Sequence, residues 1–153
     1  MTDRVLVATH YHEIELDQPR ALTFGRDEET RVRLRDDLML DVAHFFEVVE
    51  DVGDAGPFRC HTRAYSYDFR HVGGPSVVAF HYHPESRVIL PHAHVHQYTQ
   101  PVDLSKVHLP TGRTTLESII RLAIEEFGAV PHRDDWDDVL MAAEANFRGW
   151  RTW

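Results

Sequence analysis

Five histidines in the middle of the chain alternate with other residues at the spacing of one face of a β-strand. They are His81, His83, His92, His94 and His96. Because successive side chains of a strand point to opposite faces, each of the two segments would present its imidazoles on one side. Imidazole titrates near neutral pH and is the commonest metal ligand, so the pattern favours proton transfer or metal binding over packing.

An earlier segment, Phe58 to Arg70, is expected to be a strand that carries arginine and tyrosine. By strand parity, its odd-numbered residues should share one side and join the histidines on one sheet surface. Arginine binds phosphate with paired hydrogen bonds, and tyrosine rings stack on unpaired bases. The candidate substrate-binding residues are Arg59, Arg63, Tyr65 and Tyr67 on that side, which also carries His61, together with Arg113 in a loop before a helix.

These side chains together suggest a metal-independent ribonuclease. A pair of histidines can act as general base and general acid, while arginine holds the phosphate. His92 with His94 or His96 is the expected pair, and the reaction needs no cofactor. A solvated sheet face would also alternate in this way, so the arginines and tyrosines alone do not establish a site.

Metal binding is a second interpretation of the same histidines. His92, His94 and His96 would hold a divalent transition metal, as paired histidines do in cupin-like barrels. The cupin pattern also has a glutamate shortly after the histidine pair, and residues 97–101 contain none. A third interpretation is a non-catalytic interaction module whose histidines tune binding with pH.

The elements that position these residues are expected to be strands in residues 1–110 and two helices in residues 111–153. A capping box with Thr114 as N-cap and Glu117 would begin the first helix, and Gly128 would end it. Strands followed by helices predict one α+β domain over residues 1–153. Its antiparallel sheet would have five to six strands, with the two C-terminal helices covering one face and the other face open for the histidines.

The net charge of −9 is unevenly distributed over the 153 residues. Residues 55–113 carry six Lys or Arg against three acids and hold eight of the 12 histidines, whereas both flanks are acidic. The overall charge argues against a general nucleic-acid-binding protein, but one region is basic. The single cysteine, Cys60, excludes an internal disulfide and a cysteine-based zinc site. Without an apolar run of membrane-spanning length or a signal peptide, we expect a cytoplasmic protein.

Three short segments carry a resemblance to a known family: Tyr65-Ser66-Tyr67, Phe80 to Pro84, and Pro91 to His94. In these segments the middle third of the chain resembles the TumE-type toxins of bacterial toxin–antitoxin modules. The chain is longer than those toxins, its histidines alternate rather than adjoin, and its helical pair is an addition. The resemblance implies a toxin-like protein with an antitoxin partner that binds DNA. It also places His92 and His94 in the site, with His81 and His83 behind them, whereas RNA as the substrate is inferred from the side chains.

Overall fold

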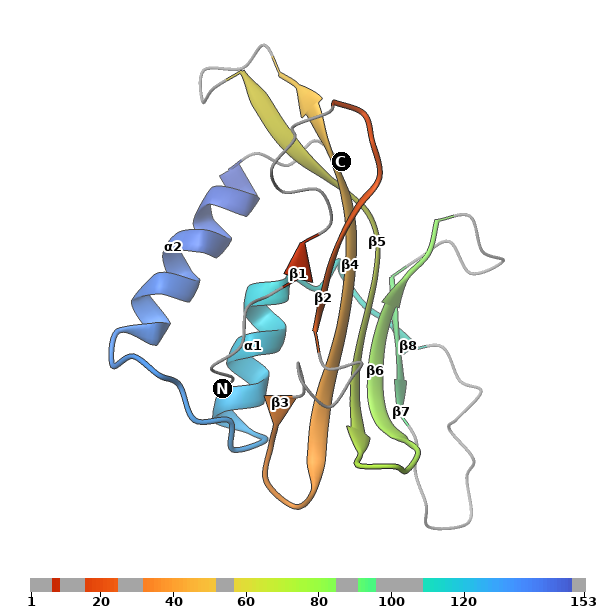
Figure 1. Ribbon diagram of the computed structural model, residues 1–153, viewed down its shortest axis with the longest axis vertical. Coiled ribbons are helices and arrows are strands. Elements are labelled where there is room, and N and C mark those ends of the chain that lie inside the picture. Colours follow the sequence, from red (N-terminus) through yellow and green to blue (C-terminus); the bar gives the residue numbers. More distant parts are fainter. Residues whose placement is uncertain are drawn as a thin grey trace.

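The computed structural model describes residues 7–8, 16–24, 32–51, 57–84, 91–95 and 109–149. It has the predicted α+β fold, an antiparallel sheet followed by two C-terminal helices (Figure 1). The strands pair in the order β1-β2-β4-β5-β6-β7-β8, and β3 also pairs with β4. The strands are β1 Val7–Ala8, β2 Arg20–Phe24, β3 Val32–Arg33, β4 Leu38–Glu50, β5 Phe58–His71, β6 Ser76–Tyr82, β7 His92–Val95 and β8 Leu109–Pro110, and the helices are α1 Leu116–Glu125 and α2 Trp136–Gly149.

The strands β4 and β5 form the long central pair of the sheet. The first half of β4 has buried apolar side chains on both faces, with Leu38, Leu40 and Val42 on one face and Met39 and Ala43 on the other. A tight turn precedes β4, and Asp36 and Asp37 both have a φ of 56° there. Short polar side chains tolerate this conformation, and the turn is closed by a 2.9 Å hydrogen bond from the Leu34 N–H to the Leu38 carbonyl. No helix in the described part of the chain is long and apolar enough to cross a membrane.

The hydrophobic core lies between the sheet and α1, and α2 packs on the outer side of α1 (Figure 1). Ile119 and Ala123 of α1 are buried against aromatic and aliphatic side chains of β2 to β5. The rings of Tyr65 and Tyr67 stack at 4.7 Å with an interplanar angle of 5°, an arrangement that adds about 0.5–1.5 kcal/mol beyond the area buried. The backbone N–H of Thr114 donates a 2.9 Å hydrogen bond to Tyr65 Oη, which ties the start of α1 to the sheet.

The N-cap of α1 is Thr115, one residue later than predicted. Its side-chain oxygen accepts a 3.0 Å hydrogen bond from the Ser118 N–H. The capping box predicted from Thr114 and Glu117 is therefore wrong. The cause is that the Thr114 backbone is hydrogen-bonded to Tyr65 of the sheet. The helix therefore begins after Thr115, whose hydroxyl serves as the cap. Glu117 then occupies the second helical position, where the helix dipole favours an acid but a capping-box bond is not made.

A β-bulge in β5 sets which side chains face α1. Phe45 pairs with Ala64, but Phe46 pairs with Thr62, so Arg63 is an extra residue in β5. Such a residue shifts the alternation of its strand by one position. β4 continues through this region with the same side chains facing the core.

The prediction that the odd-numbered residues of β5 share one side is therefore wrong. Tyr65 and Tyr67, after the bulge, point toward α1 and are 1% and 0% exposed. Before the bulge, the even-numbered Thr62 takes the α1 side, and Arg59 and His61 lie on the opposite face. Tyr65 and Tyr67 are thus core residues and not surface platforms for stacking bases.

Some positions on the face opposite α1 are buried. By register, Ala43 of β4, Ala79 of β6 and His92 of β7 all belong to that face. Their exposed fractions are 1%, 3% and 5%. On the same face, Phe45 is 36% exposed and Ser66 and His81 are half-buried, so solvent reaches this face between the buried positions.

We predict that Gly128→Ala destabilises the protein by about 1–2 kcal/mol. Gly128 has a φ of +72°, which is unfavourable for any residue with a Cβ, and a methyl group there would lie 3.1 Å from Cβ of Arg35. The matched control is Gly112→Ala, because an added Cβ there meets nothing within 4 Å. Urea unfolding measures both variants. Equal stability of the two variants would contradict the fit of α1 against the β3–β4 turn.

Candidate functional site

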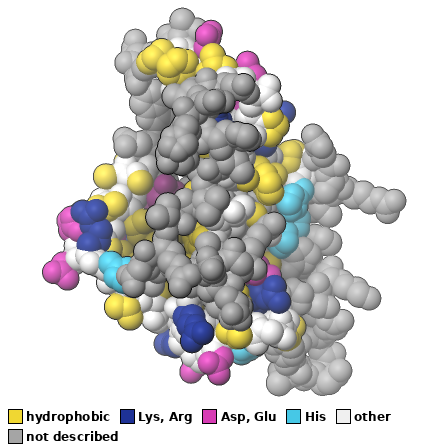
Figure 2. Space-filling view, viewed as in Figure 1, with side chains coloured by type: hydrophobic (Ala, Val, Ile, Leu, Met, Phe, Trp, Pro, Cys, Tyr) yellow, Lys and Arg dark blue, Asp and Glu magenta, His cyan; other side chains and the backbone are white. Residues whose placement is uncertain are grey.

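Three of the five predicted histidines converge on the face opposite α1. His81 of β6 pairs with His92 of β7, and their rings stack with centroids 5.8 Å apart and an interplanar angle of 9°. The ring of His83 lies 5.7 Å from that of His81. His92 is buried, whereas His81 and His83 are half-buried. Figure 2 shows histidine side chains on the side of the molecule where Figure 1 places β6 and β7.

The other two predicted histidines are only partly visible or lie outside the described residues. The backbone of His94 pairs with Ala79 in the sheet, but its side chain is outside the described part, as is all of His96. Among the residues that the structure describes, no group of three His, Cys, Asp or Glu side chains could hold a metal ion. The ring of His81 is stacked on that of His92 and tilted against that of His83. The three rings are not arranged around a common metal position.

A groove of about 720 Å³ lies at the end of β6. The last pair of β6 with β5 joins Tyr82 to Tyr65, so β5 continues past the end of β6. The groove occupies this step in the sheet. Its walls bring together the predicted residues Arg63 and His83 with His61 and Glu47, which the alternation of the sequence did not single out as a site.

A carboxylate organises the basic side chains of this groove. Oε1 of Glu47 lies 3.1 Å from Nδ1 of His61 and 3.4 Å from Nη1 of Arg63. The Glu47 side chain is only 14% exposed, whereas His61 and Arg63 are 46% and 55% exposed. When neutral His61 donates its Nδ1–H to Glu47, its lone pair is on Nε2, the atom that can accept a proton. Arg59 contacts Asp51 at 4.0 Å and does not line the groove.

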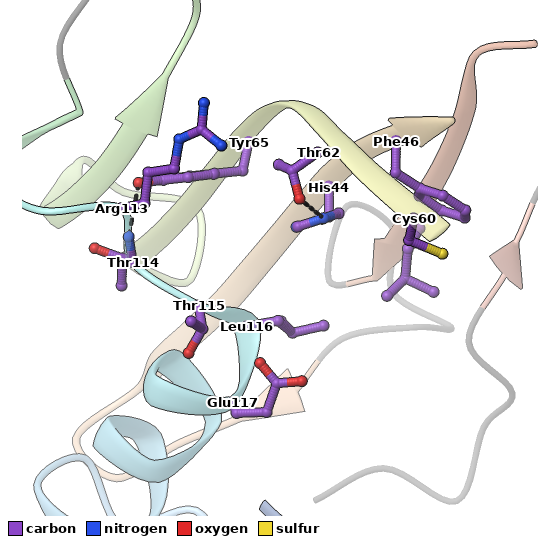
Figure 3. Close-up of a pocket in the computed structure, with 11 residues that line it drawn as sticks. His44, Phe46, Cys60, Thr62, Tyr65, Arg113, Thr114, Thr115, Leu116 and Glu117 are labelled. Atoms are coloured by element: carbon purple, nitrogen blue, oxygen red, sulfur yellow. Dashed lines mark hydrogen bonds between the residues drawn. The ribbon is translucent and has the colours of Figure 1, made fainter. Parts of the chain in front are cut away.

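A second hollow, a cavity of about 210 Å³, lies on the α1 side of the sheet (Figure 3). It is lined by β2, β4 and β5 and by the start of α1, with apolar walls from Leu22, Phe46 and Leu116. In Figure 3, Glu117 rises from α1 toward the strands, whereas the guanidinium of Arg113 lies at the other end of the view and points away from it. Sequence reasoning missed this cavity, since its residues come from four separate segments.

His44 forms the polar floor of the cavity. Its Nδ1 lies 2.6 Å from Tyr67 Oη, and its Nε2 lies 3.2 Å from Thr62 Oγ1. Burial lowers the pKa of His44 to about 4, and burial also raises the pKa of Tyr67 well above its ordinary value. Both groups are therefore neutral at pH 7, and one ring nitrogen of His44 donates while the other accepts. The sequence held a signal for this, because His44 occupies an inward position of β4 where the neighbouring inward residues are apolar.

Arg113 and Thr62 connect the two hollows. Nη2 of Arg113 donates a 2.7 Å hydrogen bond to Tyr82 Oη, and its guanidinium carbon lies 4.5 Å from the centre of the Tyr82 ring. Arg113 lines the cavity and Tyr82 lines the groove, whereas Thr62 lines both. The two hollows therefore share Thr62 in their walls and are linked by the contact of Arg113 with Tyr82.

No family model matches the chain, and neither a curated protein nor a solved structure does. The resemblance to TumE-type toxins therefore stays a prediction from short motifs.

We predict that the free energy of unfolding falls by about 2 kcal/mol between pH 7 and pH 5 because of His44. Its pKa is 6.5 unfolded and about 4 folded, so the unfolded chain takes up the proton in this range and the folded protein does not. Urea unfolding at several pH values measures the loss. His44→Gln should show a smaller loss than the wild type, and His71→Gln, at an exposed site, should follow the wild type. Parallel curves for wild type and His44→Gln would contradict a buried neutral imidazole.

Proposed function

We propose that this protein is an RNA-cleaving, toxin-like enzyme whose chemistry takes place in the groove at the end of β6. The observation that carries the proposal is that His61, Arg63 and His83 line one groove, with His61 held by the Glu47 carboxylate at 3.1 Å. Two imidazoles, one of them oriented by a carboxylate, supply a general base and a general acid. A guanidinium beside them supplies a phosphate-binding group.

In the proposed reaction, Nε2 of His61 accepts the proton of a ribose 2′-hydroxyl as the 2′-oxygen attacks the adjacent phosphorus. The bond from phosphorus to the 5′-oxygen of the next nucleotide breaks, and His83 donates a proton to that oxygen. The products are a 2′,3′-cyclic phosphate and a 5′-hydroxyl end. Arg63 balances charge on the non-bridging phosphate oxygens, and no metal takes part. His81 and His92 stack behind His83 and position its ring.

The biological setting follows from the resemblance and from the charge distribution. A toxin–antitoxin module would supply a partner that binds DNA and holds the toxin inactive in the cytoplasm. The segment 55–113 is basic on a chain of net charge −9. An acidic segment of such an antitoxin would therefore be attracted electrostatically to the region of the groove. This partner and location are part of the proposal.

The direct test is cleavage of labelled RNA by purified protein in EDTA. We expect His61→Ala and His83→Ala each to lower the rate about 10²–10⁴-fold, the usual contribution of a general acid or base. Arg63→Ala should also slow cleavage, by weaker phosphate binding. The control is His71→Gln, which changes an exposed histidine at the far end of β5 and should cleave at the wild-type rate.

Two results would overturn the proposal. Cleavage by His61→Ala and His83→Ala at the wild-type rate would remove both histidines from the reaction. Cleavage that stops in EDTA and returns with a divalent transition metal would instead favour the metal interpretation of His92, His94 and His96.

A further inference from the structure

We propose that the cavity beneath the start of α1 is a pocket for a single nucleobase and that it prefers guanine. The inference rests on the proposed function, since it supposes an RNA substrate, and it adds a base preference to that function. Single-stranded RNA is read in this way elsewhere, by unstacked bases that enter pockets with aromatic walls and polar edges.

The size and the walls of the cavity suit a flat aromatic ring. Its volume of about 210 Å³ is many times that of one water site and suits one purine base. Because the hollow is open to solvent, the ribose and phosphate of a bound nucleotide would lie outside it. Phe46 provides aromatic surface, and Leu22 and Leu116 provide aliphatic surface.

Glu117 is the polar group that would select the base. Because Thr115 is the N-cap, the Glu117 carboxylate is not engaged in a capping box. Within the described residues it makes no hydrogen bond or ion pair, although it lines the cavity and rises from α1 toward the strands (Figure 3). The two oxygens of a carboxylate accept two adjacent N–H donors. Guanine presents such a pair, N1–H and the N2 amino group, on one edge.

The polar groups opposite Glu117 complement the other edge of guanine. Tyr65 Oη accepts a hydrogen bond from the Thr114 N–H, which leaves its own hydroxyl proton to donate. Guanine offers O6 and N7 as acceptors there. His44 and Thr62 bond to each other in the floor and therefore do not discriminate between bases.

The connection between the two hollows places the rest of the nucleotide. Thr62 lines both the cavity and the groove, and Arg113 reaches from the cavity to Tyr82 in the groove wall. Arg113 uses one N–H for Tyr82, and a guanidinium has five. With the base in the cavity, the attached phosphate would pass Arg113 and enter the groove near Arg63. This assigns Arg113 the substrate-binding role that the sequence suggested.

The experiment is equilibrium binding of the four ribonucleoside 5′-monophosphates to the full chain, measured by calorimetry in EDTA. We expect guanosine monophosphate to bind at least tenfold more tightly than each of the other three. Glu117→Gln should weaken its binding about tenfold or more, because one of the two charged acceptors is lost. The control Glu126→Gln changes an exposed acid at the far end of α1 and should bind as the wild type does.

A second variant keeps the test independent of Glu117. Cys60→Trp adds a large ring to the cavity wall at an exposed strand position, so it should abolish binding of guanosine monophosphate while urea unfolding stays near the wild type.

Equal affinity for all four nucleotides, or unchanged binding by Cys60→Trp, would overturn the pocket. RNA cleavage without preference for guanine would overturn it and leave the proposed function standing. Selective binding of guanosine monophosphate without RNA cleavage would support the pocket and overturn the proposed function.

Discussion

The extra residue in β5 at Arg63 is the constraint on which the rest of this structure depends. In a regular strand, placing Tyr65 and Tyr67 beneath α1 would also place Arg63 on that side, near the position where Thr62 is now only 8% exposed. Burying a cationic side chain without a partner costs several kcal/mol, more than the stacking of two tyrosine rings returns. The bulge removes this conflict, since the core keeps its aromatic side chains and the charged residues face the other way.

The same bulge divides the chemistry of the protein between two faces. On one face, Glu47 gathers His61 and Arg63 beside His83. On the α1 face, His44, Tyr67 and Thr62 form a hydrogen-bonded floor under a small cavity. The floor of the cavity is made of neutral groups because Tyr67 is fully buried and His44 is largely withdrawn from solvent. The groove holds charged groups because His61 and Arg63 are about half exposed. Thr62, next to the bulge, borders both hollows.

Much of the fold could be predicted from the sequence because the relevant patterns are local. Strands were expected in residues 1–110, and Leu40, Val42 and Phe46 of β4 alternate as a strand requires. Gly128 was expected to end the first helix, and it follows α1. The alternation of the histidines predicted that His81 and His92 share one face on neighbouring strands, and their pairing places them there.

The candidate site was harder to predict because it depends on register between distant segments. The sequence of β5 does hold the signal, since its apolar positions change phase from Phe58 and Cys60 to Tyr65, Tyr67 and Phe69. Assuming strict alternation placed the two tyrosines beside the arginines. Glu47 and His44 looked isolated in the sequence, because their partners His61 and Thr62 come from the next strand and lie 14 and 18 residues away.

The most direct test of this account is the register of β4 and β5 in solution, measured by cross-strand nuclear Overhauser effects. The account predicts contacts between the backbone protons of Phe45 and Ala64 and between those of Phe46 and Thr62. If Phe45 contacted Ala64 and Phe46 contacted Arg63, the pairing would continue without an extra residue and β5 would be a regular strand. That result would return Arg63 and His61 to the face of the tyrosines and contradict the separation of the groove from the cavity.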